Sequence, residues 1–246
     1  MASEKIPWQL TLLGRWQLRR AGEPVVVSLR QRRLLAALAV FGARSRPFLA
    51  GTLWPDRREA QAAGNLRVCL WRVRHETPSL IDEAGDELLL GDSVEVDLHR
   101  LMDRLGSIDS EPSMTQMIDD IALLGQADFL PGWYEPWVVS EQERLQQWRL
   151  GALEALAVRF FALDRLDHGV TAATIAASID PLRESAHRLV IQGHLLAGND
   201  SAAIREYDAF RARLDRELGV EPSPMMRRLI ETIDSRSSVG GAVAVR

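Results

Sequence analysis

The chain has 246 residues, 46% of them apolar, which is enough to form the core of one large domain or of two moderate ones. No apolar run is long enough to cross a membrane, and the first seven residues lack the apolar segment of a signal peptide, so we expect a cytoplasmic protein without a membrane partner. Cys69 is the only cysteine, which excludes an intrachain disulfide and a Cys-rich zinc site.

The formal net charge of −4 conceals a strong asymmetry along the chain. Residues 1–81 hold 14 Lys and Arg against five Asp and Glu, a net charge of +9, whereas residues 82–246 hold 16 against 29, a net charge of −13. A basic, arginine-dominated segment is typical of a nucleic-acid-binding module. An ordinary solvated charged surface is the alternative interpretation.

The N-terminal part begins with a pattern typical of strands. Apolar and polar residues alternate over 8–12, 16–18 and 25–29, and Gly14 and the segment 21–24 separate the three runs. A period of two residues predicts three short antiparallel strands.

Three helices and a hairpin follow. Helical spacing runs from Gln31 to Phe41, a second short helix over 47–54 ends before Pro55, and a third over 59–76 ends at Thr77-Pro78. The apolar residues at 80–81 and 88–90 flank the polar turn 83–86, which predicts a hairpin. Strands, three helices and a closing hairpin in this order predict a winged helix-turn-helix.

The remainder is predicted to be helical. We expect one helix over 97–105, and after a stretch rich in Gly, Ser, Asp and Pro, helices over 114–124, 141–163, 170–179, 182–196, 201–218 and 224–233. The pair Ala172-Ala173 recurs as Ala202-Ala203, and small residues let helices approach closely, which predicts stacked hairpins of the tetratricopeptide kind.

The predicted fold is therefore mainly α with a small β component. It comprises a winged-helix domain over 1–105, a linker over 106–113, a tetratricopeptide-like helical domain over 114–234 and a disordered tail over 235–246.

The third helix carries the candidate DNA-contacting residues. If Leu66 lies at the centre of the buried face, 100° per residue places Leu70 and Val73 beside it and Cys69 at its edge. The opposite face then holds polar side chains suited to base edges in the major groove, with Val68 suited to a thymine methyl group. The members of this face are Gln61, Gly64, Asn65, Val68, Trp71, Arg72 and His75, and Arg67 and Arg74 lie on one flank of it. The start of the first helix carries three further arginines, Arg30, Arg32 and Arg33. A solvated amphipathic helix would leave Val68 and Trp71 unexplained.

Several segments in fixed order resemble the actinobacterial antibiotic regulatory protein (SARP) family. Residues 29–39, 46–56 and 63–74 resemble its OmpR/PhoB-type winged helix, and the second half resembles its bacterial transcriptional activation domain. The segments that carry the second resemblance are 130–133, Trp137, 141–145, 180–184, 187–189 and 217–224, followed by Leu229. Together the two matches cover residues 8–234.

The resemblance implies a function for particular residues. It implies that the third helix enters the major groove of double-stranded DNA, that the loop before it can contact RNA polymerase, and that monomers or a homodimer occupy tandem repeats. We expect base contacts from Gln61, Asn65, Val68, Cys69, Arg72 and His75, and phosphate contacts from Arg30, Arg32, Arg33, Arg46, Arg67 and Arg74. The polymerase-facing loop comprises Trp54, Asp56, Arg57, Arg58 and Glu59, although for Trp54 a place in the core is favoured. As a single unpaired thiol, Cys69 is also more often a small packing residue than a reactive group.

The hairpin departs from the family pattern. Family wings carry a basic residue that enters the minor groove, whereas this one holds Asp82, Glu83, Asp86 and Glu87 without Lys or Arg. Because acidic side chains repel phosphates, weakened or partner-assisted DNA binding follows as an expectation.

An enzyme is not expected. The sequence lacks a P-loop, a His-Glu-x-x-His zinc motif, a Gly-x-Ser-x-Gly elbow and a dinucleotide fingerprint, and we predict neither cofactor nor metal. The predicted function is a sequence-specific transcriptional activator that recruits RNA polymerase. The alternative is a protein-binding adaptor that keeps the winged helix with weak or lost DNA affinity.

Overall fold

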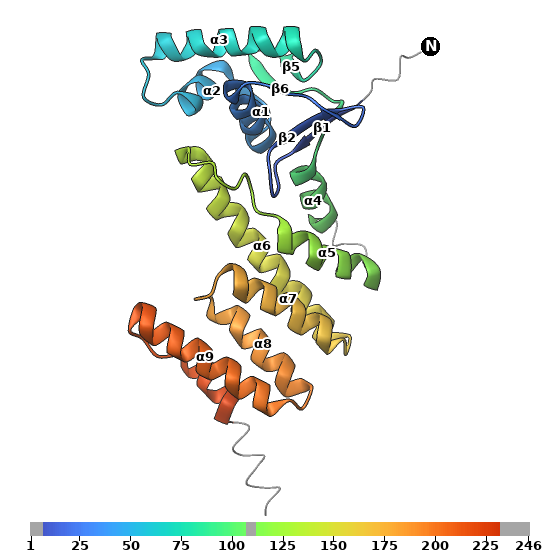
Figure 1. The fold of residues 1–246 in the computed structure, drawn as a ribbon, viewed down its shortest axis with the longest axis vertical. Coiled ribbons are helices and arrows are strands. Elements are labelled where there is room, and N and C mark those ends of the chain that lie inside the picture. The colour runs from blue at the N-terminus through green and yellow to red at the C-terminus, as the bar shows by residue number, and fades with distance from the viewer. Residues whose placement is uncertain (1–6, 107–111, 232–246) are drawn as a thin grey trace, which may run out of the picture. The chain divides into compact units, whose positions relative to one another are not determined.

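The computed structural model describes residues 7–106 and 112–231, arranged in two compact units (Figure 1). Unit 1 comprises Met1–Ser110 and Ala127–Arg144, and unit 2 comprises Glu111–Gln126 and Leu145–Arg246. The described residues are mostly helical with two small sheets, which confirms the predicted fold class. The predicted tail over 235–246 and most of the predicted linker lie outside the described residues.

Unit 1 contains both sheets. The first has the strand order β3-β2-β1-β7 and the second has the order β4-β6-β5. Pairing is antiparallel throughout, except that β1 and β7 are parallel. The strands are β1 (Trp8–Thr11), β2 (Gln17–Arg20), β3 (Glu23–Pro24), β4 (Arg44–Ser45), β5 (Ile81–Ala84), β6 (Glu87–Leu90) and β7 (Val94–Val96).

The predicted strand over 25–29 does not form there. Its place in the sheet is taken by Glu23–Pro24, and Leu29 opens the first helix instead. Ser28 explains this shift, because its backbone N–H donates to the side chain of Gln31 at 2.7 Å and so closes a helix N-terminus at this point. The hairpin formed by β5 and β6 confirms the predicted wing, with Gly85 at φ +61° in its two-residue turn.

Four helices belong to unit 1 among the residues 7–106, and side chains hold the starts of α2 and α4. α1 (Leu29–Phe41), α2 (Arg46–Leu53) and α3 (Glu59–Glu76) form the winged-helix core, and α4 (Asp97–Gly106) follows β7. Ser45 caps α2 by accepting from the backbone N–H of Phe48 at 3.4 Å. The Asp97 carboxylate accepts backbone N–H bonds from Leu12 and Leu13, which fastens the start of α4 to the end of β1.

Residues 127–144 complete unit 1. Leu13 and Phe129 form an isolated antiparallel bridge, and the Leu130 N–H donates to the Leu12 carbonyl at 2.9 Å. Phe129, Leu130 and Val138 are buried. This segment therefore adds apolar side chains to the unit that holds the winged helix.

Unit 2 is built from antiparallel helices in sequence order, in which α7 packs on α8 and α8 on α9. A further helical segment spans 224–231. The other helices of unit 2 are α5 (Met114–Gln126), the part of α6 (Pro136–Ala162) from residue 145 onward, α7 (Leu166–Ile179), α8 (Glu184–Leu196) and α9 (Asp200–Leu218).

Small residues set the spacing between these helices. Ala172 and Ala173 are fully buried, as is Ala203, whereas Ala202 is half-buried. A side chain added at Gly169 would collide with Phe161, and one at Gly193 would collide with Val170. The predicted close packing through small side chains is thus present. Among the described residues, no helix combines the length and hydropathy that a membrane span needs.

Candidate DNA-binding surface

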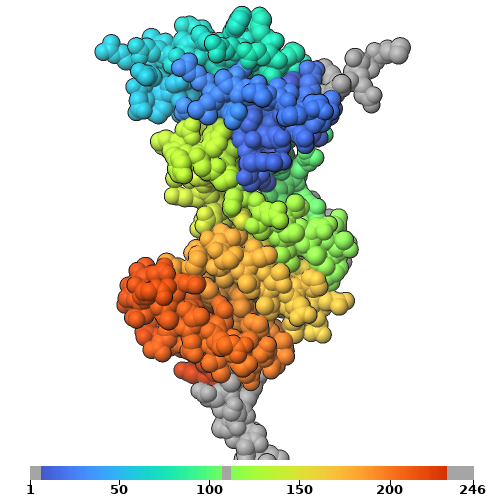
Figure 2. Space-filling view, in the orientation of Figure 1, coloured from blue at the N-terminus to red at the C-terminus, as the bar shows by residue number. Residues whose placement is uncertain are grey.

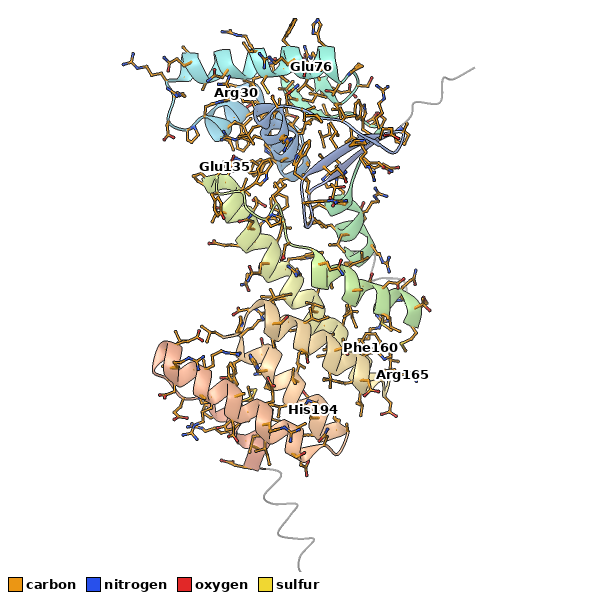
Figure 3. The ribbon with its side chains drawn as sticks, viewed as in Figure 1. Arg30, Glu76, Glu135, Phe160, Arg165 and His194 are labelled. Carbon is orange, nitrogen blue, oxygen red and sulfur yellow. The ribbon has the colours of Figure 1, made fainter. Side chains whose placement is uncertain are left out.

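Helix α3 is bonded to α1 and capped at its own C-terminus. Gln31, buried in α1, donates through its Nε2 to Glu76 Oε2 at 2.7 Å, which links the start of α1 to the end of α3. The buried Thr77 hydroxyl donates to the Val73 carbonyl at 2.8 Å and caps the helix C-terminus. Figure 3 labels Arg30 on α1 and Glu76 on α3 at this junction. These bonds fix the orientation of α3 against the core.

The opposite face of α3 is open to solvent. Ala62, Leu66, Leu70 and Val73 point into the core, so the predicted rotation of the helix is confirmed. In the view of Figure 2, α3 lies along one edge of unit 1 with no other element over it. We call this the α3 face; its members are Gln61, Val68, Trp71, Arg72 and His75, which are exposed, and Asn65, which is half-buried.

Two apolar side chains stand out on the α3 face. Val68 is 52% exposed and Trp71 is 60% exposed. The Trp71 and His75 rings lie 4.2 Å apart, and His75 Nδ1 lies 2.9 Å from the Trp71 carbonyl oxygen. Large exposed apolar groups in the middle of a charged surface indicate a contact surface rather than a solvated one.

Cys69 is not on this face, contrary to the expected base contact. It is 2% exposed, because it follows Leu66 by three residues and precedes Val73 by four, which places it on the buried side of the helix. Burial raises the pKa of its thiol from 9.0 to about 11, against the opposing effect of Arg30 and Arg72. The interpretation as a packing residue fits this environment.

A shallow depression brings together residues from all three predicted classes. Its lining includes Gln61, Asn65 and Val68 of the α3 face, Arg30 of α1, and Trp54 and Arg57 of the α2–α3 loop. Trp54, for which a core position was favoured, is only half-buried. Asp56, Arg57, Arg58 and Glu59 are exposed, as a loop that contacts another protein requires.

Two arginines of α1 already have partners within unit 1. Arg33 donates through Nη2 to the Leu53 carbonyl at 2.8 Å, at the C-terminus of α2, and its Nε lies 3.0 Å from Glu135 Oε1. Arg32 donates to the Val27 carbonyl at 3.2 Å and stacks over Trp16 at 4.8 Å from the ring centroid. Both side chains are half-buried, whereas Arg30 and Arg67 are exposed.

The remaining two predicted phosphate contacts are paired with the wing. Arg46 Nη2 lies 2.8 Å from Oε1 of Glu83, and Arg74 Nη2 forms an ion pair with the same oxygen. Sequence reasoning identified the acidic wing but not these pairs, nor the pair between Arg33 and Glu135. No sequence pattern joins residues 37 or 102 positions apart, so only the folded chain reveals them.

The comparisons with known proteins give the following similarities. Residues 122–234 match the family described as "Bacterial transcriptional activator domain". The chain is 29% identical over 240 residues to the regulatory protein AfsR of Streptomyces coelicolor, covering 90% of this chain and 24% of that protein. It is 24% identical over 216 residues to AfsR of Streptomyces griseus, covering 84% of this chain and 22% of that protein. The chain thus spans about a quarter of the length of these relatives.

A solved structure has the same fold. Mycobacterium tuberculosis EmbR, determined in complex with a low-affinity phosphopeptide, superimposes with a TM-score of 0.74 at 19% sequence identity. The match covers 94% of this chain and 66% of the EmbR chain. It confirms an N-terminal winged helix followed by a helical domain, and the two Streptomyces relatives are described as regulatory proteins.

Proposed function

We propose that this chain, a transcriptional regulator of the SARP type, binds specific double-stranded DNA with α3 in the major groove. The proposal rests on the kinds of side chain that the α3 face exposes to solvent. An arginine, amides and an imidazole on one open helix face are suited to hydrogen bonding with base edges, and Val68 is suited to contact with a thymine methyl group. The fold supports the geometry, because winged helices present this helix to DNA.

Phosphate contacts are proposed for the exposed cations beside that face. Arg30 and Arg67 are exposed. They contribute to the net charge of +9 over residues 1–81, which attracts the DNA backbone regardless of sequence. Arg32 and Arg33 serve the interior of unit 1, because their guanidinium groups are bound to carbonyl oxygens, an aromatic ring and Glu135.

Arg72 provides the test of base recognition. A selection from random duplexes would first define the preferred sequence. Arg72→Ala should then weaken binding to that sequence by about 1–3 kcal/mol and relax the preference at one base position, because a bidentate contact is lost. Fluorescence anisotropy with the selected and scrambled duplexes measures both effects.

A matched control separates recognition from charge. Arg205 is an exposed arginine on α9, so Arg205→Ala removes the same charge away from the α3 face. It should leave the base preference unchanged. If Arg72→Ala weakens specific and scrambled DNA equally, Arg72 contacts a phosphate and the proposed base contact is wrong.

We further propose that the α2–α3 loop contacts RNA polymerase and that unit 2 serves activation and assembly on tandem sites. The exposure of Arg57 and Arg58 supports the proposed contact of the loop with RNA polymerase. The match of residues 122–234 to an activator domain supports the proposed role of unit 2 in activation. Replacing Arg57 and Arg58 together by Ala should lower transcription from a selected promoter in vitro. A loss of DNA affinity of the same size would instead make them DNA contacts.

The second candidate is an adaptor that does not bind DNA. One observation favours it: Glu83 pairs with both Arg46 and Arg74, which engages two cations of the surface that would meet DNA. The random-duplex selection separates the two candidates, because an adaptor would enrich no sequence.

A further inference from the structure

Two arginines from different helices converge on one carboxylate oxygen of the wing. Arg46 opens α2 and Arg74 lies in the last turn of α3, while Glu83 lies on β5. Both guanidinium groups meet Glu83 Oε1. The side chains remain 40%, 45% and 36% exposed respectively, so solvent and ligands can reach all three.

The sheet explains why the three residues meet. Leu88 of β6 is the register partner of both Glu83 on β5 and Arg44 on β4, so Glu83 lies in the same cross-strand row as the first residue of β4. Arg46 follows β4 directly, and α3 ends only five residues before β5 begins. Backbone pairing therefore sets the positions from which the three side chains extend.

Two cations held around a single oxygen form an anion site whatever anion occupies it. A DNA phosphate oxygen carries the same charge and accepts the same charge-assisted hydrogen bonds as a carboxylate oxygen. Exposed ion pairs contribute little to stability, so exchanging the carboxylate for a phosphate costs little.

We infer that Glu83 occupies a phosphate site of the DNA-binding surface, formed by Arg46 and Arg74, and is displaced by the DNA backbone on binding. The inference rests on the proposed DNA-binding function and assigns to Glu83 a part in setting the overall DNA affinity. Phosphate contacts carry no sequence information, so an internal competitor at a phosphate site lowers affinity for all duplexes alike. Binding then depends more strongly on the base contacts of the α3 face.

The matched variants are Glu83→Gln and Glu87→Gln. Both remove one negative charge from the same hairpin, but no ion pair of Glu87 occurs within 7–106 and 112–231. With random-sequence duplex DNA at low salt, Glu83→Gln should bind roughly three- to tenfold more tightly than the unmodified chain. Its salt slope should match that of the unmodified chain, because the same two arginines bind phosphate in both complexes and only the cost of displacing Glu83 is removed. Glu87→Gln should change affinity roughly twofold or less and leave the slope unchanged.

A second comparison ties the effect to the two arginines. In a chain carrying Arg46→Ala and Arg74→Ala, adding Glu83→Gln should change neither affinity nor salt slope, because no anion site remains. Thermal unfolding should stay cooperative in both variants, with Glu83→Gln at most slightly less stable because two exposed ion pairs are lost, so that a tighter complex cannot come from a better folded chain.

Three results would overturn the inference: equal effects of the two glutamine variants, no effect of Glu83→Gln, or a gain that persists without the arginines. If the unmodified chain binds DNA and any of these is found, only this inference fails. If neither the unmodified chain nor Glu83→Gln binds any duplex, the proposed function fails with it.

Discussion

The position of Cys69 on α3 shows how one residue can lie on either of two surfaces of a helix. Val68 beside it is 52% exposed, whereas Cys69 is 2% exposed. A rotation of 100° separates the two side chains, so one step along the helix passes from the α3 face to the core. The thiol is consequently isolated from solvent reagents although it lies next to a surface proposed to contact DNA.

This environment predicts an unreactive thiol. A pKa raised from 9.0 to about 11 leaves about a hundredfold less thiolate at a given pH below 9, and only the thiolate reacts with alkylating reagents. In the folded protein Cys69 should therefore label far more slowly than in denaturant. Mass spectrometry after timed iodoacetamide exposure measures the ratio.

The same isolation should make DNA binding insensitive to mild peroxide, and Cys69→Ser should be equally insensitive. Rapid labelling of the folded chain, or loss of binding on oxidation only when Cys69 is present, would show that α3 exposes the thiol.

At the scale of elements, α8 and α9 are joined by a buried polar contact. His187 of α8 is 4% exposed; its Nδ1 lies 2.6 Å from Glu206 Oε1 on α9, and its Nε2 lies 3.1 Å from the Pro181 carbonyl. The His187 ring also stacks on Phe210 at 4.2 Å. The hydrogen bond from His187 lowers the pKa of Glu206 below its ordinary 4.5, although burial acts in the opposite direction.

The lowered pKa of Glu206 predicts an acid-sensitive contact. A carboxyl whose pKa is lower when folded stabilises the folded state above its unfolded pKa, and this stabilisation is lost as pH falls through the folded value. The stability of unit 2 should therefore decline below about pH 4.5. Glu206→Gln should be less stable near neutral pH and should lose less stability on acidification, as denaturant unfolding at a series of pH values would measure.

Glu221 supplies the control for that experiment. It pairs with Arg211 between two exposed side chains, so Glu221→Gln should alter the acid response much less. If Glu206→Gln and Glu221→Gln reduce the loss of stability at acid pH equally, the contact between α8 and α9 is not the source of that loss.

At the scale of the whole molecule, the boundaries of the matched family region do not coincide with the boundaries of the two structural units. Residues 122–234 match one family, yet residues 127–144 belong to unit 1, and their backbone pairs with Leu12 and Leu13. Phe129 is 4% exposed within that segment. The stability of the winged-helix unit thus depends on residues from the matched activator region.

Two phenylalanines test this dependence. Phe129→Ala should cost about 3–5 kcal/mol and increase hydrogen exchange in α1 and β1 of unit 1, because it leaves a cavity there. Phe210→Ala removes the same side chain from the core of unit 2, where it packs with Ile191 and Leu214, and should increase exchange in α8 and α9 instead. If Phe129→Ala loosens unit 2 and leaves unit 1 protected, the division into units is wrong.

Local physics explains what the sequence alone determined. The Trp54-Pro55 step set the end of α2 within one residue, because proline disfavours helical geometry in the residue before it. The period of 100° per residue predicted which side of α3 is buried, and the Gly85-Asp86 turn predicted the wing. Each of these features depends on neighbours close in the chain.

Contacts between distant residues were decided only by the tertiary structure. The parallel pairing of β1 with β7, the place of 127–144 in unit 1 and the convergence of Arg46 and Arg74 on Glu83 each join residues that no local pattern connects. An arginine has the same helical propensity and charge whether its partner is a carboxylate of the same chain or a phosphate. The sequence therefore determined that arginines surround α3, and only the folded chain decided which of them are already paired.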